Sequence, residues 1–190
     1  MHHDVLDRFR HLGALLDGHF KLSSGLHSPA YLQCALVLQH PAEAEELGRA
    51  LAARLAHTRP TVVLSPALGG LIIGHEVARG LGVRAIFAER VDGVLTLRRG
   101  FDLSAADRVL VVEDVVTTGG STRETMDVAT ALGASVVGAA AVVNRSGKDN
   151  PVDVEFASLA AITPPTYQPD ACPYCAQGIP VVKPGSRAAR

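Results

Sequence analysis

The strongest constraint on the fold is the stretch Val109–Arg123, with the sequence VLVVEDVVTTGGSTR. Its apolar start predicts a buried strand, and this strand ends in two adjacent carboxylates, Glu113 and Asp114. A turn rich in hydroxyls and glycines follows and leads into a helix. The N–H groups and the dipole at a helix N-terminus favour an anion, and glycine lets the backbone approach it closely. The neighbouring acids suit sugar hydroxyls or Mg²⁺. The stretch therefore predicts a sugar-phosphate site.

The composition indicates one globular domain of the α/β class. The chain has 190 residues, of which 47% are hydrophobic and 19% charged, so it can bury a substantial core. Tryptophan is absent and aromatic residues make up 4%, so the core depends on Val, Leu, Ile and Ala. The net charge of −1 gives no nucleic-acid or membrane signature, and we expect no partner of either kind.

The termini and the cysteines predict a cytoplasmic protein. The N-terminus lacks the basic and then apolar order of a signal peptide. No apolar run approaches the roughly 18 residues that a membrane span needs. Three cysteines, an odd number, do not make a disulfide framework.

Strands and helices are expected to alternate through the middle of the chain. Apolar runs predict strands, and 3.6-residue periodicity predicts helices between them. A strand, a loop, a helix and another strand in succession favour a parallel sheet. The expected strands are 61–65, 84–88, 108–113, 135–143 and 154–159, and the expected helices are 41–57, 71–81 and 120–132.

Outside this alternation the expectations are less regular. Residues 4–17 are predicted to be a helix that Asp4 can cap. Residues 20–33 are expected to be irregular, with one short strand at 31–33. Asp92-Gly93 is a hairpin turn signal, followed by a short strand at 94–97. The residues from 163 onward look like a tail rich in Pro and Gly.

The predicted loops gather at one edge of the sheet. In an open parallel sheet, ligands bind at the carboxyl ends of the strands. The loops at 65–70, 89–93, 113–122 and 144–149 all follow such ends. The loop at 113–122 lacks the Gly-Lys-Ser/Thr of a nucleotide P-loop, and it is not a dinucleotide fingerprint. A purely structural capped turn remains an alternative for it.

The stretch Val109–Thr122 resembles the ribose-phosphate motif of the type I phosphoribosyltransferases, which bind phosphoribosyl pyrophosphate (PRPP). Over nearly its whole length the chain resembles the orotate phosphoribosyltransferase family. The other matching pieces are Phe20–Gly25, Ser28–Tyr31, Ser65–Gly70, Ala88–Arg90, Asn144–Arg145 and Lys183–Arg187.

The resemblance implies a fold and a reaction. The fold would be a parallel sheet flanked by helices, in one phosphoribosyltransferase domain over 1–190, with a core at about 41–160 and a hood from about 1–40 and 160–190. The family makes orotidine 5′-monophosphate and pyrophosphate from orotate and PRPP, with Mg²⁺, in pyrimidine biosynthesis. Its members are homodimers with shared active sites.

The resemblance also implies roles for individual residues. Glu113, Asp114 and Arg90 would be catalytic. Mg²⁺ would be carried by PRPP, and Asp114 is the candidate protein ligand for it. Orotate would meet Ser24, Gly25, Tyr31, Thr117 and Arg145. PRPP would meet Ala67, Leu68, Gly69, Arg90, Glu113, Asp114, Val115, Val116, Thr117, Thr118, Gly119, Gly120 and Ser121.

Two departures from the family pattern leave other functions open. Gly69 stands where many relatives carry a lysine, and the loop at 89–100 keeps Arg90 but has no lysine or histidine. Either Arg98 and Arg99 supply those charges, or the leaving group is stabilised less. The alternatives are a purine or xanthine phosphoribosyltransferase and a regulator that senses PRPP without catalysis.

The pair Cys172 and Cys175 is a weak metal signal. It offers two ligands where structural zinc usually takes four, and a metal would need Cys34 or a second copy's pair. The eight histidines show no ligand spacing. We therefore interpret the two cysteines as plain thiols, and a redox pair is less favoured still, because the motif does not open a helix after a strand.

Overall fold

The computed structural model describes residues 5–22 and 24–184. The chain forms two compact units. Residues 37–162 make the first, which we call the sheet unit, and residues 1–36 with 163–190 make the second, the terminal unit. The expected helix cap Asp4, the position Ser23 and the end of the tail lie outside the described residues.

The sheet unit contains a six-stranded sheet in the order β5-β4-β3-β6-β7-β8. All neighbouring strands are parallel except β4 and β5, which form an antiparallel hairpin. The prediction of a parallel sheet is therefore confirmed, with one antiparallel edge. The strands are β3 (Val62–Pro66), β4 (Arg84–Val91), β5 (Val94–Leu97), β6 (Arg108–Val116), β7 (Ser135–Asn144) and β8 (Phe156–Ala161).

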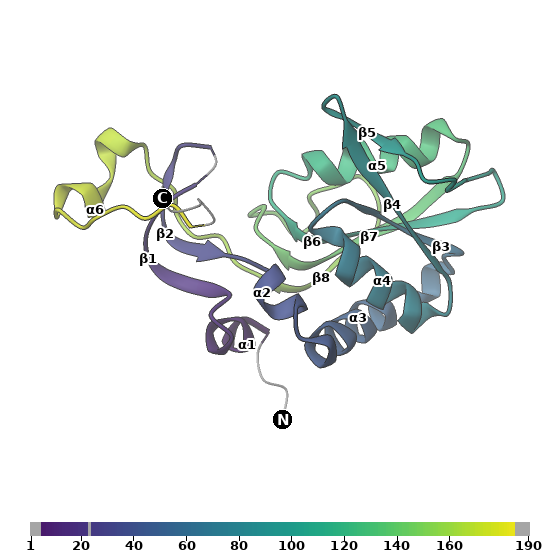
Figure 1. The fold of residues 1–190 in the computed structure, drawn as a ribbon, viewed down its shortest axis with the longest axis horizontal. Helices are drawn as coiled ribbons and strands as arrows, with labels where there is room; N and C mark the ends of the chain where they lie inside the picture. Colours follow the sequence, from purple (N-terminus) through teal and green to yellow (C-terminus); the bar gives the residue numbers. More distant parts are fainter. Residues whose placement is uncertain (1–4, 23, 185–190) are drawn as a thin grey trace. The chain divides into compact units, whose positions relative to one another are not determined.

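Three helices cover both faces of this sheet (Figure 1). They are α3 (Pro41–Leu55), α4 (Gly70–Leu81) and α5 (Gly120–Ala131), each within about two residues of its predicted bounds. A short 3₁₀ turn, η1 (Ala56–Thr58), follows α3. Proline opens α3 at the first position, where its missing N–H costs no helical hydrogen bond. The central strands are consequently buried on both faces, as their continuous apolar sequences predict.

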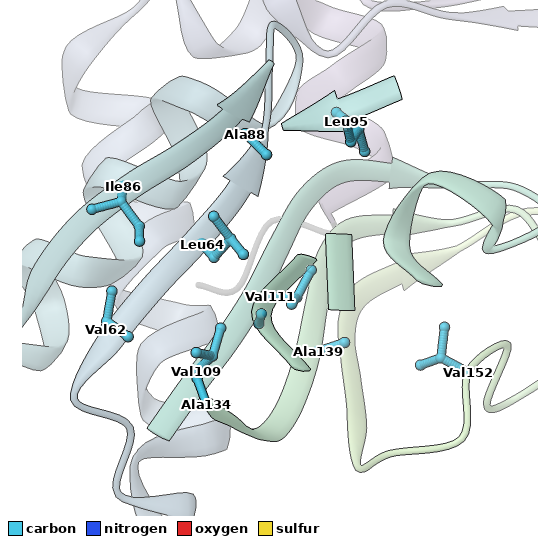
Figure 2. Close-up of a cluster of buried hydrophobic side chains, with 11 residues drawn as sticks. Val62, Leu64, Ile86, Ala88, Leu95, Val109, Val111, Ala134, Ala139 and Val152 are labelled. Carbon is cyan, nitrogen blue, oxygen red and sulfur yellow. The ribbon is translucent and has the colours of Figure 1, made fainter. Parts of the chain in front are cut away.

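The core beneath α5 is built from small and branched side chains, as the composition predicts (Figure 2). Val62 and Leu64 of β3 meet Val109 and Val111 of β6, and all four are 0% exposed. Ala129 of α5 belongs to the same cluster. This packing fixes β6 against α5, and so fixes the loop between them.

The terminal unit differs from its prediction in two respects. Helix α1 (Val5–His11) is shorter than the predicted 4–17, because Gly13 takes a positive φ of 67° and strand β1 (Leu15–Lys21) begins soon after. The region expected to be irregular is mostly an antiparallel pair of β1 with β2 (His27–Leu32). That expectation was wrong, because Gly25 lies in the turn of a hairpin and Pro29 lies within strand β2.

Short elements complete the described chain. Helix α2 (Ala35–Leu38) precedes α3, and the segment after residue 162 contains the 3₁₀ turn η2 (Pro169–Ala171) and helix α6 (Pro173–Ala176). Tyr167 pairs with His27, and Val182 pairs with Phe20, so this segment adds to the hairpin. Among the described residues, no helix is long and apolar enough to cross a membrane.

Candidate active site

The two acids of the opening motif lie within strand β6. The strand was predicted to end at residue 113, but it continues to Val116, because Val115 and Val116 pair with Val143 and Asn144 of β7. Successive side chains of a strand point to opposite faces, so Glu113 and Asp114 face different ways. Glu113 is 7% exposed, and the Asp114 carboxylate accepts a hydrogen bond of 2.9 Å from the Val115 N–H.

Burial raises the pKa of both carboxyl groups. The pKa of Glu113 rises to about 7, mainly through desolvation, with smaller contributions from the nearby charges of Asp114 and Glu124. A hydrogen bond with the Ser121 side chain opposes this rise. Burial also raises the pKa of Asp114, against the stabilising N–H of Val115. Such shifts gather at functional sites.

Two buried oxygens of this motif lack a partner within the part of the chain that the structure describes. They are Oε1 of Glu113 and Oγ1 of Thr122. Leaving a buried polar group unsatisfied costs about 1–3 kcal/mol, so an external donor is expected to satisfy it. A sugar hydroxyl can donate to the Glu113 oxygen. The carboxylates of Glu113 and Asp114 also fit Mg²⁺, a hard cation that prefers oxygen ligands.

The N-cap residue of α5 makes no side-chain hydrogen bond to the helix. This residue is Gly119, with φ 76°. A Cβ at this position would lie 2.8 Å from an Arg123 nitrogen and 2.9 Å from the Pro151 carbonyl oxygen, so only glycine fits. Arg123 donates to the carbonyls of Thr118 and Pro151, both at 2.8 Å, and braces the loop. The Gly120 N–H donates a hydrogen bond of 3.4 Å to the Thr118 hydroxyl, and the exposed Thr117 and Thr118 lie beside the helix N-terminus, which suits a phosphate.

A pocket of about 360 Å³ adjoins this loop. Its lining residues are Thr117, Thr118, Arg123, Arg145, Ser146, Lys148 and Pro151. Asn144 shapes one wall, because its amide donates to the Lys148 carbonyl and accepts from Ser146. The structure thus brings together Thr117 and Arg145, which the resemblance assigned to the base. It adds Arg123 and Lys148, which sequence reasoning missed although the polar loop at 144–149 was noted.

The loop after β3 approaches the acids closely. The peptide bond between Ala67 and Leu68 is cis, and the Leu68 side chain is 82% exposed. A Cβ on Gly69 would lie 2.6 Å from Oδ1 of Asp114. Any side chain at position 69 would therefore displace that carboxylate. The missing lysine at Gly69 has a local steric reason in this chain.

The arginines of the β4–β5 hairpin are engaged with acids. Arg90 forms an ion pair of 2.6 Å with Glu124 of α5 and donates to the Gly93 carbonyl at 2.7 Å. Arg99 pairs with Glu89 at 2.9 Å, and Arg98 lies 3.7 Å from the same carboxylate. The predicted Asp92-Gly93 turn is confirmed, with positive φ at both residues.

Comparison with known proteins identifies the family of this chain. The model of the phosphoribosyl transferase domain matches residues 35–166. Orotate phosphoribosyltransferase of Pelotomaculum thermopropionicum is 53% identical over 184 residues, which cover 97% of each chain. The enzyme of the same name from Carboxydothermus hydrogenoformans is 51% identical, over 97% of each chain. The chain belongs to the orotate phosphoribosyltransferase family.

Solved structures support the fold of this family. Orotate phosphoribosyltransferase of Aeropyrum pernix aligns with a TM-score of 0.70, at 24% identity, over 83% of this chain and 93% of its own. The Mycobacterium tuberculosis enzyme of the same name, solved in complex with 5-phospho-α-D-ribosyl 1-diphosphate, aligns with a TM-score of 0.67, at 24% identity and over the same shares. At this identity the likeness concerns the fold alone.

The remaining residues that the family resemblance assigned to the base belong to the terminal unit. Gly25, with φ 86°, closes the β1–β2 turn, and its N–H donates to the Leu22 carbonyl at 2.9 Å. Ser24 at this turn is exposed. The Tyr31 ring packs against Phe20, with centroids 5.8 Å apart. A base contact by Ser24, Gly25 and Tyr31 stays a prediction.

Proposed function

We propose that the chain transfers the phosphoribosyl group of PRPP to orotate, giving orotidine 5′-monophosphate and pyrophosphate, in pyrimidine biosynthesis. The observation that supports this proposal is sequence identity to two orotate phosphoribosyltransferases, 53% and 51%, each over 97% of this chain. In the reaction the bond from the anomeric carbon to pyrophosphate breaks, and a bond to a ring nitrogen of orotate forms. That nitrogen loses its proton.

Glu113 and Asp114 hold the ribose in this proposal. The unpaired Oε1 of Glu113 accepts a hydrogen bond from a ribose hydroxyl, and Asp114 binds the neighbouring hydroxyl. The negative charge of Asp114, and of Glu113 once it has lost its proton, lies beside the sugar as its anomeric carbon becomes cationic. In a site that excludes water, fixed charges of this kind stabilise a developing charge strongly.

The loop from Val115 to Ser121 binds the 5′-phosphate. The N-terminus of α5 supplies N–H donors, and Thr117, Thr118 and Ser121 supply hydroxyls. Fixing the phosphate positions the anomeric carbon for attack. Positioning is the main contribution a protein can make to a reaction with little covalent chemistry of its own.

The loop Ala67–Gly69 and Arg90 receive the pyrophosphate. To reach it, Arg90 exchanges its surface ion pair with Glu124 for the phosphate, and exposed pairs of this kind are worth about 0–1 kcal/mol. The positive charge of Mg²⁺, when bound with PRPP, offsets the charge of the departing pyrophosphate. Asp114 is the protein carboxylate best placed against this loop.

Arg145 binds the orotate carboxylate. It lines the pocket beside Thr117, and a guanidinium matches a carboxylate with two parallel hydrogen bonds. Ser24, Gly25 and Tyr31 flank the base, and all of residues 1–190 make one phosphoribosyltransferase domain. The active protein is a cytoplasmic homodimer whose sites are shared between the two copies.

The test is a spectrophotometric assay of orotate loss with PRPP and Mg²⁺. We expect orotate consumption that depends on both, with hypoxanthine and xanthine left unchanged in parallel reactions. Turnover of a purine without turnover of orotate would replace the proposal with a purine phosphoribosyltransferase. PRPP binding without turnover of any base would favour a regulator.

A further inference from the structure

Four potential metal ligands meet in the terminal unit. They are His19 of β1, His27 of β2, and Cys172 and Cys175 on either end of the short α6 turn. One ligand atom from each lies within 4.8 Å of the other three. Three of these residues are buried, and Cys175 is exposed. Among the described residues this is the one such group of histidine, cysteine and acidic side chains.

Four of the six distances between the ligand atoms are close to the edges of a tetrahedron around zinc. With Zn–S of about 2.3 Å and Zn–N of about 2.0–2.1 Å, tetrahedral N···S edges are about 3.6 Å. The observed Sγ···N distances are 3.4 Å for Cys172 to His19, 3.8 Å for Cys175 to His19 and 3.4 Å for Cys175 to His27. Nε2 of His19 and Nδ1 of His27 are 2.9 Å apart, against about 3.3 Å in an ideal tetrahedral zinc site. The other two pairs, Cys172 with His27 and Cys172 with Cys175, lie within 4.8 Å, so a shift of about 1 Å or less completes the site.

The backbone explains how residues so distant in sequence converge. The β1–β2 register shifts between Asp17 and Phe20, so His19 and Phe20 are both buried although they are neighbours in a strand. A bulge of this kind re-aims a side chain. At the other end of the chain, Cys172 is the N-cap of α6, and one helical turn brings Cys175 to the same side.

The outer contacts of His19 are those of a metal ligand. Its Nδ1 lies 2.8 Å from the Ile179 carbonyl oxygen, so Nδ1 carries the proton and Nε2 directs a lone pair at the cluster. The Tyr174 ring stacks on the imidazole, with centroids 5.5 Å apart and planes 28° apart. A metal-bound histidine commonly donates its other N–H to a carbonyl in this way.

We propose that His19, His27, Cys172 and Cys175 together bind one Zn²⁺ as a closed structural site. Two thiolates and two imidazoles in a tetrahedral arrangement favour zinc among the common metals. All four positions are filled by the protein, so none is open for catalysis. The interpretation of the cysteines as plain thiols changes accordingly. The ligands that they lacked are two histidines, not Cys34 or a second copy.

The zinc ties the two ends of the chain together. The hairpin already holds the segment after residue 162 through backbone bonds of His27 with Tyr167 and of Lys21 with Val182. These bonds are few, and a metal that joins residue 19 to residue 175 adds a strong clip. We therefore expect zinc to hold the terminal unit in its fold, while the sheet unit keeps its own apolar core.

The test uses untagged full-length protein, purified under reducing conditions from zinc-supplemented medium. We expect elemental analysis to find about one zinc per chain. Cys172→Ser and Cys175→Ser should lower this to near zero. The matched controls are Cys34→Ser, a buried cysteine outside the cluster, and His11→Gln, an exposed histidine of the same unit. Both should keep the zinc.

Two further measurements on the wild-type chain do not depend on how the variants fold. Zinc exchanged for Co²⁺ should give the strong visible absorption of a tetrahedral cobalt thiolate. Hydrogen exchange should speed up in β1, β2 and α6 when a chelator removes the metal, and slow again on adding Zn²⁺. A wild-type chain without zinc or cobalt absorption would overturn the proposal. A Cys172–Cys175 disulfide in that protein, or zinc retained by both cysteine variants, would also overturn it.

Discussion

The β6–α5 loop and the β4–β5 hairpin differ in the surroundings of their charged side chains, which are desolvated in the loop and exposed in the hairpin. In the loop, Glu113 and Asp114 are desolvated, their pKa values are raised, and a Glu113 oxygen has no partner in the described chain. In the hairpin, Arg90 and Arg99 are exposed and already paired with Glu124 and Glu89. The loop is thus organised before its ligand arrives, whereas the hairpin must give up contacts to act.

The difference indicates which of the two regions contributes more to catalysis. Fixed, desolvated groups need no rearrangement when charge develops in the substrate. Exposed ion pairs contribute about 0–1 kcal/mol each and exchange partners readily. We therefore expect substitutions in the loop to reduce catalysis more than matched substitutions in the hairpin.

The largest expected effect is that of Asp114→Asn. Removal of this charge beside the cationic sugar should lower kcat about 100- to 1,000-fold, with circular dichroism unchanged. Orotate loss under saturating PRPP and Mg²⁺ measures it. The matched control in the hairpin is Glu89→Gln, which should retain turnover within about tenfold. Equal losses in the two variants would remove the distinction between loop and hairpin.

Glu113 should make the ligand-free protein less stable as the pH rises. Its pKa is about 7 in the fold against an ordinary value of 4.5, so the native state binds more protons between these values. The free energy of unfolding should fall by up to about 3 kcal/mol as the pH rises through this window. Urea unfolding at about pH 5 and about pH 8 measures this. Glu113→Gln should remove the part of this pH dependence that Glu113 contributes. If the variant's unfolding free energy changed with pH as much as that of the wild type, the Glu113 carboxyl would not be desolvated.

Arg145→Ala should raise the orotate KM about 30-fold, the range expected for lost hydrogen bonds to a charged group. The PRPP KM should change much less. The matched control is Arg99→Ala in the hairpin, which removes an exposed guanidinium paired with Glu89. Steady-state kinetics with each substrate varied in turn measures both KM values. Equal shifts in the two KM values for Arg145→Ala would move the carboxylate contact elsewhere.

The smallest expected effects are those of alanine substitutions at two glycines, Gly69 and Gly93. Gly69→Ala places a Cβ against the Asp114 carboxylate and should lower kcat about tenfold. Gly93→Ala in the hairpin meets nothing within 4 Å, but its φ of 86° disfavours alanine. It should cost about 1 kcal/mol of stability and leave kcat unchanged. Kinetics and thermal unfolding of both variants separate crowding from backbone strain, and a reversed pattern would contradict the contact at Gly69.

The sheet unit was largely predictable from sequence. Apolar strands separated by periodic helices fix a parallel order, and Asp92-Gly93 fixes the hairpin. The ends of strands were less predictable, because pairing with β7 carries β6 three residues beyond Glu113. The terminal unit was predicted poorly, since the partners of β1 and β2 include Tyr167 and Val182, which no local pattern relates to them.

The candidate site shows the same limit. Glu113, Asp114 and the loop that follows them were found because they are contiguous in one motif. Lys148 was missed because only folding places it near Thr117, and Arg123, although it ends the same motif, was given no role. The histidine pair was missed because His19 faces the cluster only through a shift in register. The available signal was the order of two histidines in a hairpin and a later Cys-x-x-Cys.

The pairing of the first hairpin with the end of the chain constrains the order of events during synthesis. Strands β1 and β2 leave the ribosome before the sheet unit, yet Tyr167 and Val182, which bond to His27 and Lys21, are made after it. The sheet unit, which ends at residue 162, can assemble while its N-terminal hairpin still waits for these partners. The terminal unit therefore closes only after translation has passed Val182.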